Sequence, residues 1–142
     1  MVVTFALYFL RLRSIEFSML GIICSLLFAV PHEFIHGIFM AGNVFMYQNL
    51  KQGMLFVLCD GDMTKGRFVL VSLAPNIVFG FIPFILFMIN PSWIFLGTLG
   101  ALSIPMGAGD YINVHSALTQ MPKGALTYLS GIHSYWYIKE EV

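Results

Sequence analysis

The residues best suited to chemistry lie together in one apolar stretch, where positions 31–37 read PHEFIHG. On a helix, positions i and i+4 share a face, so His32 and His36 can present two imidazoles to one zinc ion. Glu33 would then lie beside the metal, where a carboxylate can deprotonate a water molecule as a general base. In a chain with only four histidines, an H-E-x-x-H pattern arises by chance at roughly one in 300. The spacing therefore predicts a zinc site with His32 and His36 as ligands and Glu33 as the catalytic residue.

Two histidines do not complete such a site, because catalytic zinc generally takes three protein ligands and keeps one position for water. The candidates for the third ligand are Asp110, His115 and His133. At about 1.5 Å per helical residue, Asp110 comes to nearly the depth of His32 when their two helices run in the same direction. His115 falls at or beyond the far headgroups, and His133 lies in the tail. Asp110 is the predicted third ligand, with His115 as the alternative.

Two asparagines in the apolar stretches are candidates for contact with a substrate. Asn76 and Asn113 carry amide groups that can hold a substrate carbonyl or the oxyanion of the transition state. The alternative for each is a hydrogen bond between neighbouring helices.

Composition predicts that a membrane surrounds these residues. The 142 residues are 58% hydrophobic and only 10% charged, whereas soluble domains carry about 25% charged residues. Seven basic residues balance seven acidic ones, which leaves no basic field for nucleic acid. Three apolar stretches are long enough to cross a bilayer as helices. They are Phe17 to about Met46, Phe68 to Ile89, and Trp93 to about Leu118.

Between the first two stretches, two β-favouring runs flank an Asp-Gly pair at Asp60. The runs are Met54–Cys59 and Arg67–Val71, and their pattern predicts a short hairpin at the membrane surface. The expected fold class is therefore an all-α membrane protein with three transmembrane helices and a short surface β-hairpin between the first and second helices. We expect a single membrane-embedded domain over 1–142, with its core at about 15–118 and an interfacial tail at 119–142.

This arrangement resembles the intramembrane metalloproteases of the site-2 protease type. It is more closely similar to small bacterial zincin peptidases, grouped as a domain of unknown function, that carry H-E-x-x-H in one span and an Asp ligand in a later one. In this chain His32, Glu33, His36 and Asp110 match that pattern, and Pro105 precedes Asp110 by the family's five positions.

The neighbours of the third ligand depart from the family's pattern, since Gly109 and Tyr111 stand where the family has Leu and Gly. The resemblance covers roughly residues 15 to 118. It implies a zinc metalloendopeptidase that cleaves a membrane-embedded or membrane-proximal peptide bond.

The expected partners are a membrane protein or peptide substrate and the lipid bilayer, with a homo-oligomer or a regulatory subunit left open. Two arginines precede the first stretch and the other five basic residues lie on the opposite side of the three spans. The positive-inside rule then places the C-terminus in the cytoplasm of a multi-pass protein of a bacterial cell membrane. The alternative function is a non-enzymatic multi-pass membrane protein with a structural or regulatory metal site. In that case Glu33→Gln leaves function intact.

Overall fold

The computed structural model describes residues 2–12, 16–49, 54–131 and 133–139. The chain divides into two compact units. The first unit comprises 1–32 and 75–108, and the second comprises 33–74 and 109–142.

The first unit is helical in its described residues. Its elements are α1 (Val2–Leu12), α2 (Met19–Leu27), the π-helix η1 (Ile77–Phe81), α5 (Ile82–Ile89) and α6 (Ile94–Met106). Ser18 caps α2, because its side-chain oxygen accepts a hydrogen bond from the amide of Gly21 at 3.2 Å. Tyr8 is fully buried in the core of this unit, where its hydroxyl donates to the carbonyl of Glu16 at 2.6 Å. Gly97 lets α6 approach this core closely, since a Cβ there would overlap the ring of Phe87.

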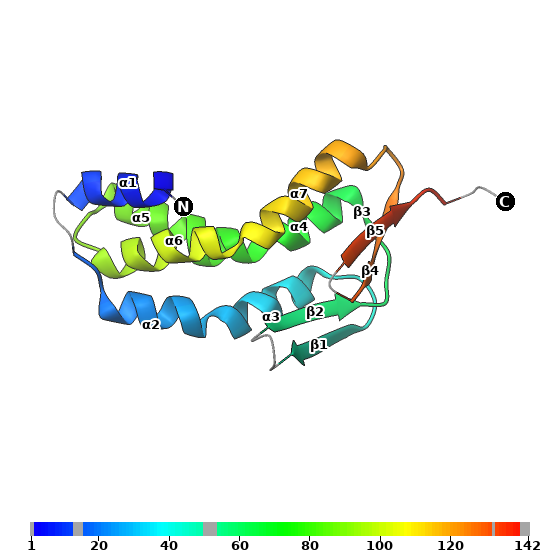
Figure 1. Ribbon diagram of the computed structural model, residues 1–142, viewed down its shortest axis with the longest axis horizontal. Helices are drawn as coiled ribbons and strands as arrows, with labels where there is room; N and C mark the ends of the chain where they lie inside the picture. Colours follow the sequence, from blue (N-terminus) through cyan, green and yellow to red (C-terminus); the bar gives the residue numbers. More distant parts are fainter. Residues whose placement is uncertain (1, 13–15, 50–53, 132, 140–142) are drawn as a thin grey trace. The chain divides into compact units, whose positions relative to one another are not determined.

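The second unit combines helices with two small antiparallel sheets (Figure 1). Helices α3 (Ala29–Phe39), α4 (Lys65–Asn76) and α7 (Ala108–Gln120) supply most of its helical residues. One sheet pairs β1 (Val44–Asn49) with β2 (Met54–Cys59), and Met46 faces Val57 in its register. The other sheet has the order β3 (Met63–Thr64), β4 (Leu126–Ser130) and β5 (His133–Tyr137). The core is apolar and consists of Met40, Val57, Cys59, Met63, Phe68, Val71, Ala117, Met121 and Ala125.

Short polar contacts close the base of the β1–β2 hairpin. The carboxylate of Asp60 accepts the backbone amide of Asn43 at 2.7 Å and its side-chain amide at 2.8 Å. These two hydrogen bonds hold the pKa of the Asp60 carboxyl below its usual value. Gly42 adopts a φ of +76°, a left-handed conformation that favours glycine. The chain therefore leaves α3 in a tight turn whose polar groups form hydrogen bonds with nearby residues.

Side chains near the start of α4 form hydrogen bonds at the ends of α3, α4 and α7. Thr64 caps α4, since its side-chain oxygen accepts the amide of Arg67 at 3.3 Å. The Arg67 guanidinium donates to the last carbonyls of α3, those of Phe39 and Met40, at 2.8 Å each. Lys65 donates to the carbonyl of Met121, just beyond α7, at 2.8 Å. Positive charge at helix C-termini is favourable because the helix dipole is negative there.

By length and composition, one helix in the described residues could cross a membrane. Elements α4, η1 and α5 form a continuous apolar helix of 25 residues from Lys65 to Ile89. A second span would exist only if α2 and α3, which bend at Phe28, were counted as one broken span. This finding indicates membrane association weakly, and it does not support a multi-pass protein.

The prediction of an all-α protein with three transmembrane helices is therefore wrong. The first predicted stretch breaks at Phe28 and its helix ends at Phe39, and β1 follows it. Pro31 explains the break, because it has no amide hydrogen for the carbonyl of Leu27. The third stretch divides at Gly107 into α6 and α7, of 13 residues each. A Cβ at Gly107 would overlap the side chain of Asn76, which explains why this position is a glycine.

The predicted hairpin is only half right. Met54–Cys59 is a strand, but its partner is Val44–Asn49, and Arg67–Val71 lies within helix α4. The cap at Thr64 and the continuous helix that follows outweigh the β-branched residues of that segment. The tail over 119–142, expected as an interfacial segment, contains strands β4 and β5 of the second sheet.

Candidate metal centre

Helix α3 carries the H-E-x-x-H motif. His36 lies four residues after His32 on this helix, so the two side chains project from the same face. Pro31 is tolerated here because it lies in the first turn, where backbone amides have no partner within the helix. The helix thus arranges the first two predicted ligands as the sequence spacing requires.

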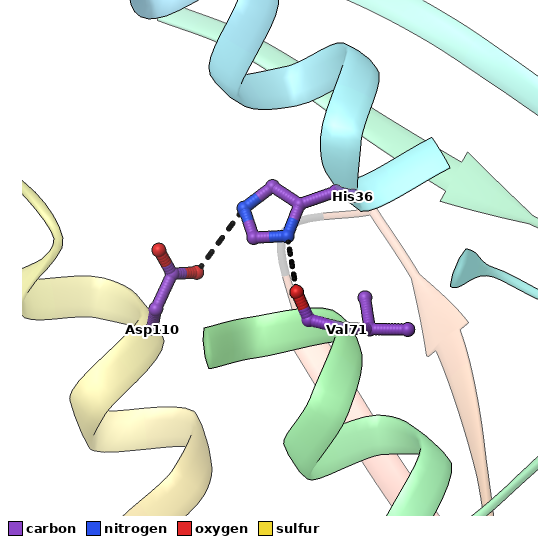
Figure 2. A network of polar contacts seen from close by, with 3 residues as sticks. All are labelled: His36, Val71 and Asp110. Atoms are coloured by element: carbon purple, nitrogen blue, oxygen red, sulfur yellow. Dashed lines mark hydrogen bonds and ion pairs between the residues drawn. The ribbon is translucent and has the colours of Figure 1, made fainter. Parts of the chain in front are cut away.

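The imidazole of His36 is held by the backbone of α4. Its Nδ1 lies 2.8 Å from the carbonyl oxygen of Val71, as Figure 2 shows. A carbonyl can only accept a hydrogen bond, so Nδ1 carries the hydrogen and donates it. In a regular helix the Val71 carbonyl would accept the amide of residue 75, but that residue is a proline, which has no amide hydrogen. Pro75 therefore leaves the Val71 carbonyl available for His36.

This hydrogen bond determines which ring nitrogen of His36 faces Asp110 on α7. With the hydrogen on Nδ1, the neutral ring directs the lone pair of Nε2 outward. Nε2 lies 3.4 Å from Oδ1 of Asp110, which belongs to the first turn of α7. The ring is buried, with 7% of the His36 surface exposed. An acceptor that orients a histidine through the N–H of its other ring nitrogen is the usual second layer of a zinc site.

The His36–Asp110 pair fits a zinc ion better than a direct hydrogen bond. A charge-assisted N–H···O bond would measure about 2.7 to 2.9 Å, which is shorter than the observed 3.4 Å. Two ligand atoms at tetrahedral positions around zinc lie about 3.4 Å apart when each is about 2.0 to 2.2 Å from the metal. Two electron-rich atoms at this separation repel each other unless a cation or a proton lies between them. The donor set of imidazole nitrogen and carboxylate oxygen is also the one that catalytic zinc takes.

A cavity of about 280 Å³ opens beside this pair in the second unit. Glu33, His36, Asp110 and Asn113 line it, so the predicted base, two predicted ligands and one predicted substrate contact share one space. Asn113 follows Asp110 by three residues on α7 and therefore projects from the same side of that helix. This arrangement leaves room for a water molecule and part of a substrate next to the ligands.

Of the other candidates, only His133 is among the residues that line this cavity. Asn76 belongs to the first unit, is almost fully buried and packs against Gly107, so it does not line this cavity. His115 is exposed on α7 and is also not among the lining residues. His133, on the exposed strand β5, does line the cavity. The role of Asn76 in binding substrate and the choice of Asp110 over His115 stay predictions.

The sequence reasoning missed Val71 and Pro75 as residues of the site. The signal was present, because a proline inside a helix always frees the carbonyl four residues before it. Applied to Pro75, this argument identifies Val71 as an available acceptor.

Comparison with known proteins gives one match. No curated protein and no solved structure matches the chain. The likeness to site-2 proteases and cleavage within the membrane therefore stay predictions. A family model described as Putative zincin peptidase matches residues 25–126. Because this range is more than half of the chain and contains both the H-E-x-x-H motif and Asp110, the chain belongs to that zincin peptidase family.

Proposed function

We propose that this protein is a zinc metalloendopeptidase that cleaves a membrane-embedded or membrane-proximal peptide bond. The observation that carries the proposal is the geometry of His36, whose Nδ1 donates to Val71 while its Nε2 faces Asp110 at 3.4 Å. Membership of a zincin peptidase family supports the same chemistry. The ligand set that we propose is His32, His36 and Asp110, with His32 one turn before His36 on α3.

In this proposal Glu33, Val71 and Asn113 each have a defined role. Zinc, when bound, polarises the scissile carbonyl and lowers the pKa of a water molecule. Glu33 accepts the proton of the attacking water on a carboxylate oxygen and later passes it to the nitrogen of the leaving amine. The Val71 carbonyl keeps the His36 ring in one tautomer and one orientation. Asn113 donates from its side-chain amide to the oxygen of the scissile carbonyl, where negative charge develops.

The membrane part of the proposal rests on composition and on one helix. The 25-residue helix from Lys65 to Ile89 is about 37 Å long at 1.5 Å per residue. This length exceeds the thickness of the hydrocarbon core of a bilayer, which is about 30 Å. Its first part, residues 65–74, belongs to the same unit as the cavity. This helix and the apolar composition support a substrate bond in or near the bilayer.

The test combines metal analysis with one conservative substitution. Protein purified in detergent should contain about one zinc per chain, as expected for a single three-ligand site. Glu33→Gln should retain the zinc and lose zinc-dependent cleavage of a membrane-anchored peptide, since the amide keeps the shape of the side chain but cannot accept a proton. Cleavage by Glu33→Gln at the wild-type rate would refute the enzymatic assignment. It would favour a non-enzymatic membrane protein with a structural or regulatory metal site.

A further inference from the structure

A second cavity in the same unit shares a wall with the one beside His36. It has a volume of about 330 Å³ and lies between α3 and the β1–β2 hairpin. Glu33 and Val57 line both cavities. The proposed catalytic carboxylate therefore stands at the boundary between two separate spaces.

The helical positions of α3 explain how one glutamate borders both cavities. At about 100° per residue, His36 and Met40 lie to one side of Glu33, and Phe34, Gly37 and Ile38 lie to the other. The first group lines the cavity beside His36, and the second group lines the other cavity. Glu33 is thus the residue at which the two flanks of the helix meet.

The second cavity has mainly apolar walls, and the first combines the polar residues around His36 with an apolar part. In the second cavity, strand β1 contributes Val44 and Met46, and Met46 faces Val57 of β2 across the ladder. Glu33 is the one charged residue among those that line it. The apolar part of the first cavity includes Met40, Phe68 and Leu129. The apolar parts of these walls accept apolar side chains, because burying apolar surface away from water is favourable.

We propose that the two cavities are the binding sites for the two side chains that flank the scissile bond, so that the enzyme cleaves between two apolar residues. In an extended peptide, successive side chains point to opposite sides of the backbone. A scissile bond placed beside Glu33 therefore directs one flanking side chain into each cavity. This inference rests on the proposed function, and it adds the class of substrate: an extended segment with an apolar residue on each side of the bond.

The first experiment measures selectivity on a set of detergent-solubilised peptides that vary only in the two residues around one bond, with products mapped by mass spectrometry. Wild-type protein should cleave Leu-Leu at least about tenfold faster than Leu-Ser or Ser-Leu, a usual value for a lost apolar contact. Met46→Ala enlarges the second cavity, and Leu129→Ala enlarges the first. Each variant should gain cleavage of Phe on one side of the bond only, and the two variants should affect opposite sides.

Matched controls come from the adjacent positions of the same strands. Phe45 and Tyr128 are similarly apolar, but alternation along a strand turns them to the opposite face, and they line neither cavity. Phe45→Ala and Tyr128→Ala should keep the wild-type selectivity. The inference is overturned if Met46→Ala and Leu129→Ala leave selectivity unchanged, if both alter the same side of the bond, or if the wild-type protein prefers a basic residue at either side.

The second experiment separates this inference from the proposed function. Zinc-loaded Glu33→Gln protein is titrated with a peptide analogue whose central bond is a reduced, uncleavable amide, and binding is followed by fluorescence anisotropy. The Leu-Leu analogue should bind at least about tenfold more tightly than the Ser-Ser analogue, and Met46→Ala should reduce that ratio. Equal binding of the two analogues overturns the two-cavity inference. Selective binding without any cleavage by the wild-type protein refutes the peptidase assignment and supports the two cavities.

Discussion

Replacing Pro75 by alanine should stabilise the protein and at the same time weaken its zinc binding. Proline at this position removes the amide that would pair with the Val71 carbonyl within α4. That carbonyl accepts the Nδ1 hydrogen of His36 instead. An alanine restores the missing amide, which then competes with His36 for the same acceptor. The imidazole loses the partner that orients its Nε2 toward Asp110.

The two effects have opposite signs and can be sized separately. A proline in a helix interior costs about 3 kcal/mol relative to alanine. Because Pro75 is fully buried, the smaller alanine leaves a void that takes back about 1 kcal/mol of this gain. The buried N–H of His36 that loses its acceptor takes back about 1 kcal/mol more, so the net stabilisation is about 1 kcal/mol. Loss of a residue that orients a metal ligand typically weakens metal binding by about 10 to 100-fold. A merely destabilising substitution would lower both quantities, and a merely stabilising one would not weaken zinc binding.

The assay pairs denaturant unfolding of the metal-free protein with competitive zinc titration against a chelating dye. Pro83→Ala is the matched control, because it restores an amide in the same apolar helix eight residues further along. It should leave zinc affinity unchanged. Wild-type zinc affinity in a folded Pro75→Ala protein would refute the view that the freed Val71 carbonyl orients His36.

Four further outcomes follow from the same contacts. In metal-free protein, His36→Asn should be more stable than His36→Ala by about 1 to 3 kcal/mol, because the asparagine amide can still donate to the buried carbonyl; both variants should lose zinc. Asp110→Ala should lose zinc while His115→Ala keeps it, and the reverse result in the titration would exchange the two ligands. Because the pKa of the Asp60 carboxyl is lowered, its stabilising effect is present above about pH 4 and is lost as the pH falls through the lowered value; Asp60→Asn should flatten this dependence in urea unfolding. Lys65 and Arg67 lie at the first end of the 25-residue apolar helix, and the positive-inside rule places that end in the cytoplasm. Ser92 follows the other end, so the thiol of Ser92→Cys should react with external reagent in cells. Labelling only after permeabilisation would contradict that orientation.

The candidate site was largely predictable from the sequence because its chemistry depends on short-range spacing. A separation of four residues places His32 and His36 on one helix face wherever that helix lies, and α3 has this geometry. Asp110 was chosen from a calculation of depth in three spans, of which the first and third were taken to run in the same direction. The choice of residue is compatible with the structure, where Asp110 faces His36, although the three-span fold behind the calculation is wrong.

The fold was less predictable, because apolar content does not distinguish a spanning helix from shorter elements that pack on one another. The stretch from Phe17 to Met46 has the composition of one long helix, yet it contains a helix break, a left-handed glycine and the start of a strand. Pro31 and Gly42 were the local signals of these changes. Hydropathy averages over such residues, whereas backbone hydrogen bonding responds to each of them.

Pro75 links the backbone of α4 to the proposed metal centre. A carbonyl freed inside an apolar helix is costly unless another group donates to it. A zinc-binding histidine has the complementary need, since its second ring nitrogen requires an acceptor that holds the ring in place. The hydrogen bond from His36 to Val71 meets both needs at once. The acceptor is a backbone carbonyl, so the identity of the side chain at position 71 does not indicate its role. The sequence signal for this hydrogen bond is the proline four residues later, Pro75.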